Sequence, residues 1–154
     1  VAGSVEAFVE MMNEKAQSLG CQDTHFVNPH GLHDENHYVT AYDMYLIFNE
    51  ALHYDLIYEI IAMPSYTTTY KDKDGNDKEL SVNSTNLYLQ GQKDAPGSVT
   101  VIGGKTGTTN AAKNCLILLS RSTSGKSYIS VILRSESRDT LYDEMTDLLD
   151  EIKN

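Results

Sequence analysis

The sequence of 154 residues has no tryptophan, three prolines, two cysteines and no long apolar run. A bilayer span needs about 20 predominantly apolar residues, and no stretch of this chain approaches that length. Basic residues are also scarce, because 12 Lys and Arg face 22 Asp and Glu, which gives a net charge of −10. Since Lys and Arg supply most of the affinity for nucleic acids and anionic membranes, this balance argues against both as partners.

The potential metal ligands follow no known pattern of spacing. Cys21 and Cys115 lie too far apart for a metal knuckle and are too few for a disulfide framework. A polar loop over residues 22–38 contains four histidines, but their spacing matches no zinc motif, so a structured turn is the simpler interpretation. The acidic segment 72–77 has Gly75 two residues too early for a calcium loop, which favours a hairpin tip. We therefore expect no metal and no cofactor.

Hydrophobic periodicity predicts helices at both ends of the chain and strands between them. Apolar residues at the helical period indicate helices from Ser4 to Gly20, from Thr40 to Leu52 and from Asp55 to Met63, where Pro64 follows. A last helix is predicted by Leu141, Met145, Leu148, Leu149 and Ile152. Strands are expected over 65–70, around Leu80 and Val82, and over 99–109, 114–120 and 127–133. The sequence therefore predicts an α+β fold, an antiparallel sheet with helices packed on it.

The strand over 114–120 is apolar at every position from Cys115 to Leu119. A strand buried on both faces has this continuous pattern, whereas a half-exposed strand alternates. We expect the last helix to cover one face of the sheet and the helices before Pro64 to cover the other.

Residues 103–107, Gly-Gly-Lys-Thr-Gly, form the sharpest motif. A phosphate-binding loop would need glycine at Val99 and a helix directly after Thr106, and both requirements fail. The alternative is a Lys-Thr-Gly element on an edge strand beside an active-site cleft, as in penicillin-interacting serine enzymes. There Lys105 would provide a positive field, Thr106 a hydroxyl for a substrate carboxylate, and Gly107 close access to the backbone.

Several segments together resemble the D-alanyl-D-alanine carboxypeptidases, serine peptidases among the low-molecular-weight penicillin-binding proteins. The matching segments are 7–13, 19–20, the phrase Asp-Thr-His-Phe-Val-Asn-Pro-His-Gly-Leu at 23–32, and 40–44, 83–87 and 103–109. Relatives usually have asparagine in place of Asp23 and glycine in place of Lys113. The resemblance implies the penicillin-binding-protein and β-lactamase type of transpeptidase fold over nearly the whole chain.

The resemblance also implies site residues. Lys105 would be the electrostatic partner of the nucleophile, Thr106 would bind the terminal carboxylate of a D-Ala-D-Ala peptide, and the N–H of Thr108 would be an oxyanion-hole donor. Gly107 completes the motif. Arg138, with Arg134 as its rival, matches an arginine that helps to anchor the carboxylate.

The family's Ser-x-x-Lys pair is absent, because no serine in the sequence is followed three residues later by lysine. Ser81-Val82-Asn83 and Ser84-Thr85-Asn86 match the family's Ser-x-Asn element but lie in the wrong place, so we interpret both as chance matches. Residues 1–154 are therefore expected to be the C-terminal portion of one D,D-peptidase domain, cut before Val1 and inactive alone.

Three expectations about the parent protein follow from the resemblance. It would trim peptidoglycan stem peptides through an acyl-enzyme and be inhibited by β-lactams. It would act on the cell-wall side of the bacterial cytoplasmic membrane, associated with that membrane in the way relatives are. The alternative is a non-catalytic module that binds a peptide through an open sheet edge or associates with itself.

Overall fold

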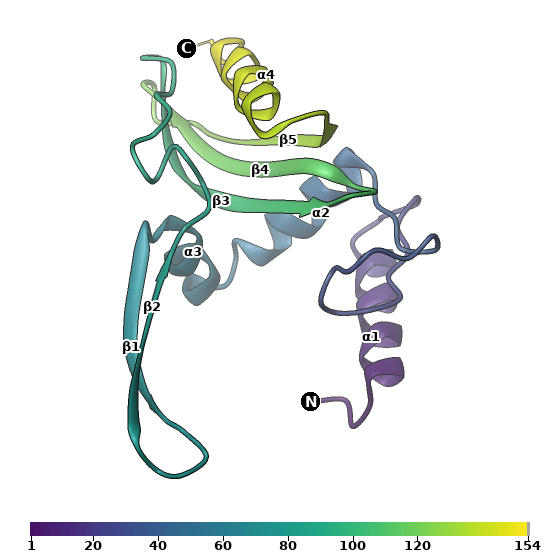
Figure 1. Ribbon diagram of the computed structural model, residues 1–154. Helices are drawn as coiled ribbons and strands as arrows, with labels where there is room; N and C mark the ends of the chain where they lie inside the picture. The colour runs from purple at the N-terminus through teal and green to yellow at the C-terminus, as the bar shows by residue number, and fades with distance from the viewer. Residues whose placement is uncertain (154) are drawn as a thin grey trace.

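The computed structural model describes residues 1–153 and contains two separate antiparallel sheets with helices around them (Figure 1). The element order is α1 (Val5–Ser18), α2 (Ala41–Ala51), α3 (Asp55–Ala62), β1 (Ser65–Lys71), β2 (Asp77–Asn83), β3 (Val99–Thr109), β4 (Lys113–Ser122), β5 (Ser127–Ser135) and α4 (Arg138–Asp150). These bounds confirm the predicted elements, with differences of a few residues at their ends.

The larger sheet has the order β3-β4-β5, and helices cover both of its faces (Figure 1). Leu116 and Leu118 of β4 pack in a buried cluster with residues of α4, while Ile117 and Leu119 pack with residues of α2 and α3 on the opposite face. Successive strand side chains point to opposite faces, so an uninterrupted apolar strand has to be covered twice. The prediction for the central strand is confirmed.

A β-bulge interrupts the pairing of β3 with β4 between Val101 and Gly103. Val101 packs with the cluster on the α4 face, whereas Ile102 packs with the cluster on the α2 and α3 face. Gly103 lies on that second face as well, because a Cβ added to it would stand 2.4 Å from the backbone oxygen of Ile61 in α3. Two successive residues therefore face the same way, and the alternation resumes with opposite phase beyond the bulge.

Strands β1 and β2 form a hairpin that extends away from the main sheet (Figure 1). Within residues 1–153 neither strand pairs with β3, β4 or β5, so the expectation of one sheet is corrected to two. The apolar side chains of the hairpin stay about half exposed, at 53% for Tyr66, 51% for Tyr70, 47% for Leu80 and 46% for Val82. At its tip Asp72 Oδ1 accepts hydrogen bonds from the backbone N–H groups of Asp74 and Asn76, both at 2.9 Å.

Helix α1 is tied to the loop that follows it rather than to the sheet. The side chain of Asn13 makes two hydrogen bonds with the backbone of Phe26, at 2.7 and 2.8 Å, and the Lys15 ammonium lies 2.5 Å from the Glu50 carboxylate of α2. Gly20 has φ +90°, the left-handed conformation expected at the helix end. Among residues 1–153, no helix is long and apolar enough to cross a membrane.

Candidate active site

The motif residues Lys105, Thr106 and Gly107 lie on β3, which is an edge strand of the larger sheet as predicted. Lys105 pairs with Ile117 and Thr106 pairs with Leu116, so the two side chains point to the two faces on which those partners are buried. Thr108 shares the α4 face with Thr106, because strand side chains alternate. The edge strand therefore presents two hydroxyls on one face and directs an ammonium toward the other.

A cleft of about 530 Å³ lies at the α4 side of this edge and collects the predicted site residues. Its lining contains Lys105, Thr106, Gly107, Thr108 and Arg138. Arg138 reaches it because it is the first residue of α4, directly after the cap Ser137, whose hydroxyl accepts from Thr140 N–H at 3.0 Å.

The rival Arg134 is not among the residues that line this cleft. It adopts the left-handed conformation at φ 63°, where its backbone N–H points to the sulfur of Cys115 at 3.5 Å. Of the two arginines, the structure thus brings only Arg138 into the lining of the cleft beside the motif. Cys115 also lines the cleft and is half-buried with a free thiol.

One lining residue, Thr85, was not among the predicted site residues. It belongs to the segment 83–87, which the sequence offered only as part of the family resemblance. In the structure its hydroxyl is hydrogen-bonded to the hydroxyl of Thr106, and its backbone oxygen accepts from the Arg138 guanidinium at 3.4 Å and from the Tyr142 hydroxyl at 3.3 Å. Strand periodicity could not predict this contact, since it joins a loop to an edge strand.

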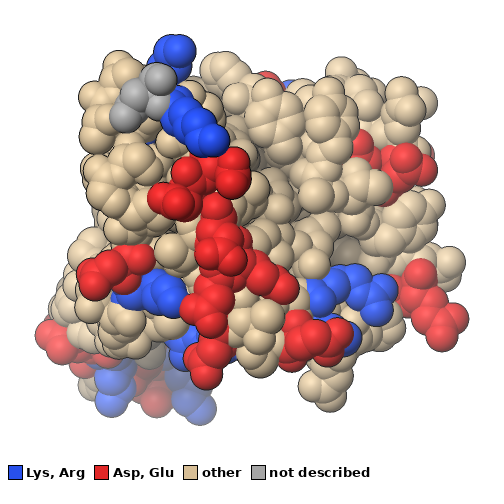
Figure 2. All heavy atoms as spheres, turned by 90° about the horizontal axis from the view of Figure 1, so that it is seen from above, with Lys and Arg blue, Asp and Glu red and all other residues tan. Residues whose placement is uncertain are grey.

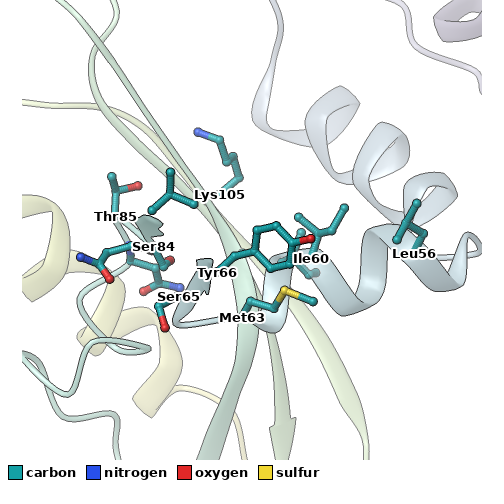
Figure 3. A pocket seen from close by; sticks show the side chains of 13 residues that line it. Leu56, Ile60, Met63, Ser65, Tyr66, Ser84, Thr85 and Lys105 are labelled. Carbon is teal, nitrogen blue, oxygen red and sulfur yellow. Dashed lines mark hydrogen bonds between the residues drawn. The ribbon is translucent and has the colours of Figure 1, made fainter. Parts of the chain in front are cut away.

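A second cavity of about 660 Å³ opens on the other side of the motif, between α3, the base of the hairpin and β3. Figure 3 shows Leu56 and Ile60 of α3 on one side of it and Thr85 and Lys105 on the other, with Tyr66 between. The walls of this cavity are mostly apolar, and Lys105 is the charged residue among those that line it. Its ammonium is hydrogen-bonded to the backbone oxygen of Thr106.

The charge around the site is uneven. Helix α4 carries five carboxylates, at positions 139, 143, 144, 147 and 150, and acidic side chains form a band across the face of the molecule where this helix lies (Figure 2). Lys93 lies 2.6 Å from the Asp143 carboxylate in that region. Lys105 and Arg138 are thus the cations of a cleft in a strongly acidic protein, and they provide the local attraction for an anionic ligand.

Hydrogen bonds within the histidine-rich loop help to fix its conformation. His25 Nδ1 donates to the Asn36 backbone oxygen at 2.6 Å, and His37 Nδ1 accepts from Val27 N–H at 3.2 Å. Burial lowers the pKa of His37. Over the described part of the chain, no group of three or more His, Cys, Asp or Glu side chains is placed to hold a metal ion.

The start of α2 is fixed by a buried carboxylate. Asp43 Oδ2 accepts from the Thr24 hydroxyl at 2.7 Å and from Asp23 N–H at 2.9 Å, which ties the loop to the helix. Burial acts to raise the pKa of Asp43, but these hydrogen bonds stabilise the carboxylate more strongly, so that its pKa lies below the usual value. Since Asp23 contributes its backbone N–H to this contact, its departure from the asparagine of relatives leaves the contact unchanged.

Comparison with known proteins identifies the class. The chain has the fold of the Streptomyces K15 DD-transpeptidase, with a TM-score of 0.85 and 26% identity over 95% of this chain and 53% of that one. It is also similar to a D-alanyl-D-alanine carboxypeptidase from Mycobacterium tuberculosis, with a TM-score of 0.79 and 28% identity over 97% of this chain and 54% of that one. The fold is thus that of the penicillin-binding DD-peptidases, as the sequence predicted.

Residues 1–137 match the family of D-alanyl-D-alanine carboxypeptidases, and the chain belongs to this family. Among its relatives is the carboxypeptidase DacF of Bacillus subtilis, which is 41% identical over 118 residues, 75% of this chain and 27% of that protein. The chain therefore spans about half the length of the solved relatives and about a quarter of this curated one.

Proposed function

We propose that this chain is the C-terminal portion of the catalytic domain of a serine-type D-Ala-D-Ala carboxypeptidase. The observation that supports it best is the cleft at the edge of β3, where Thr106, Thr108 and Arg138 gather beside Lys105. Hydroxyls on one face of an edge strand, with a guanidinium from α4 beside them, suit a carboxylate, and the open strand edge suits an extended peptide.

Each residue takes a separate part in the proposed reaction. The Thr106 hydroxyl and the Arg138 guanidinium bind the terminal carboxylate of the stem peptide. A serine outside this chain attacks the carbonyl carbon of the penultimate D-Ala, and the terminal D-Ala leaves with a proton on its nitrogen. Thr108 N–H stabilises the oxyanion, and Lys105 provides positive potential near the nucleophile. Water then hydrolyses the acyl-enzyme.

The location of the substrate sets where the protein works. Peptidoglycan lies outside the cytoplasmic membrane, so the proposed site of action is the cell-wall side of that membrane, with the parent protein associated with the membrane surface. β-Lactams, which present a carboxylate beside a strained amide, would be inhibitors at the same cleft.

The direct test is covalent labelling of the intact protein with a radiolabelled or fluorescent penicillin. We expect one adduct per molecule, lost after Lys105→Ala and retained after Lys126→Ala, a matched change of an exposed lysine in the turn before β5. Absence of any adduct on the intact protein would refute the proposal.

For the chain of 154 residues alone we expect no acylation, because it contains no Ser-x-x-Lys pair. Intact-mass measurement after incubation with penicillin gives the answer directly. A stoichiometric mass increase would show that a serine within residues 1–154 is a competent nucleophile and would overturn this part of the proposal.

A second candidate function is a module that binds a peptide or a second copy of itself. Exposed apolar side chains around the larger cavity favour it, since Leu56, Ile60 and Tyr66 are 64%, 52% and 53% exposed. Large exposed apolar patches commonly mark interaction surfaces. Sedimentation velocity at several concentrations distinguishes a self-associating module from one that binds a peptide as a monomer. A concentration-independent monomer would exclude self-association.

A further inference from the structure

The loop 84–87 contacts two of the proposed carboxylate ligands at once. Through its side chain, Thr85 is hydrogen-bonded to the Thr106 hydroxyl, and through its backbone oxygen it accepts from Arg138 Nη2 at 3.4 Å. Thr106 belongs to β3 and Arg138 to α4, and Thr85 is the residue through which the two are joined.

We infer that Thr85 is a positioning residue for the carboxylate subsite, fixing the Thr106 hydroxyl with its own hydroxyl and the Arg138 guanidinium with its backbone oxygen. The inference rests on the proposed function, since it assigns a task to a residue of the same cleft.

The donors and acceptors available on the two threonine hydroxyls decide which of them donates in the hydrogen bond between Thr85 and Thr106. A threonine hydroxyl has one proton and can accept two further hydrogen bonds. Thr106 can donate its proton to a substrate carboxylate only if it accepts from Thr85, so Thr85 is the donor of the pair when an anion is bound. Without that donor the Thr106 hydroxyl is free to rotate, and ordering it costs binding free energy.

Thr85 is itself held firmly by α4. The hydroxyl of Tyr142, which is 2% exposed, donates to the Thr85 backbone oxygen at 3.3 Å and accepts from Leu87 N–H at 2.9 Å. The neighbouring Asn86 is buried at 1% exposure, and its Oδ1 accepts from Tyr88 N–H at 3.1 Å. A loop fixed in this way can act as a template for the half-buried side chain of Thr106 and the exposed side chain of Arg138.

The test compares two ligands that differ only in the carboxylate: benzylpenicillin and its neutral methyl ester. The second-order acylation rate of the intact protein is measured for each. For Thr85→Val we expect a rate roughly tenfold lower with the carboxylate ligand and unchanged with the ester, since hydrogen bonds to charged groups are stronger than neutral ones and this one acts indirectly. Thr85→Ser, which keeps the hydroxyl, restores the rate.

Two further variants make the comparison secure. Thr85→Ala removes the hydroxyl without adding a branched methyl and should give the same ratio between ligands as Thr85→Val. Thr100 is an exposed threonine on β3, the strand of Thr106, and lies outside the cleft, so Thr100→Val should leave both rates unchanged. Circular dichroism of each variant shows that the fold is retained.

The possible outcomes distinguish failure of the positioning role from failure of the proposed function. If the wild-type protein is acylated and removal of the Thr85 hydroxyl changes both rates equally or neither rate, the positioning role is overturned and the proposed function stands. If the wild-type protein is acylated by neither ligand, the proposed function fails and the inference fails with it.

Discussion

Substitution of two adjacent leucines near the end of α4 tests how much of the free energy of unfolding comes from the helix face that packs against the sheet. Leu149 is 0% exposed and lies in the cluster that α4 forms with β4, whereas Leu148 is 40% exposed. Substitution by alanine removes three carbon atoms, worth about 2.4 kcal/mol for a fully buried side chain at ~0.8 kcal/mol per methylene. A residual cavity raises the loss for Leu149→Ala to about 3–4 kcal/mol.

For Leu148→Ala the expected loss is about 1 kcal/mol, because part of the side chain is already in water and solvent fills the space it leaves. The two variants therefore differ by about 2–3 kcal/mol in the free energy of unfolding, or about 1–1.5 M in the urea midpoint at a slope of about 2 kcal/mol per M. Helix propensity changes equally in both and cancels. Equal midpoint shifts in the two variants would refute the packing described for α4.

Two other predictions concern a close contact and a titration. Gly103→Ala places a Cβ 2.4 Å from the Ile61 backbone oxygen and should lower the free energy of unfolding, measured in urea, by about 1–3 kcal/mol. Gly97→Ala, whose Cβ would have nothing within 4 Å, should lower it far less. Equal losses would contradict the close approach of α3 to β3. His37 must be neutral to accept from Val27 N–H, and burial lowers its pKa from the ordinary 6.5. The free energy of unfolding should therefore fall as the pH drops below about 6.5, and His37→Asn should flatten this dependence on pH. An unchanged pH dependence in the variant would count against the hydrogen bond.

The sequence was most informative where composition leaves one structural solution. The unbroken apolar run in β4 required two covered faces, and both are covered. Lys113 offered a subtler signal: relatives usually have glycine there, and the structure places this residue in the left-handed region at φ 54°. Glycine adopts that conformation without steric cost, so the substitution marks a turn that the chain makes in spite of its side chain.

Other features lay beyond what periodicity can determine. Leu148 fits the apolar period of the last helix but is 40% exposed, whereas Tyr142, which the predicted apolar face did not include, is buried. Its ring packs in the cluster, and its hydroxyl is hydrogen-bonded. The hairpin was predicted, but a period of two does not say whether its apolar face packs within the molecule, and Leu80 and Val82 remain 47% and 46% exposed. The Thr85 contact depends on how a loop passes an edge strand, which no local pattern encodes.

The bulge between Val101 and Gly103 decides which ligand chemistry each cleft can serve. With uninterrupted alternation from Val101, the Lys105 side chain would point to the α4 face, and the hydroxyls of Thr106 and Thr108 would point to the face of the apolar cavity. One extra residue in the strand exchanges these places. An insertion or deletion at Ile102 would therefore invert the chemistry of both clefts without changing a single residue of the Lys-Thr-Gly motif.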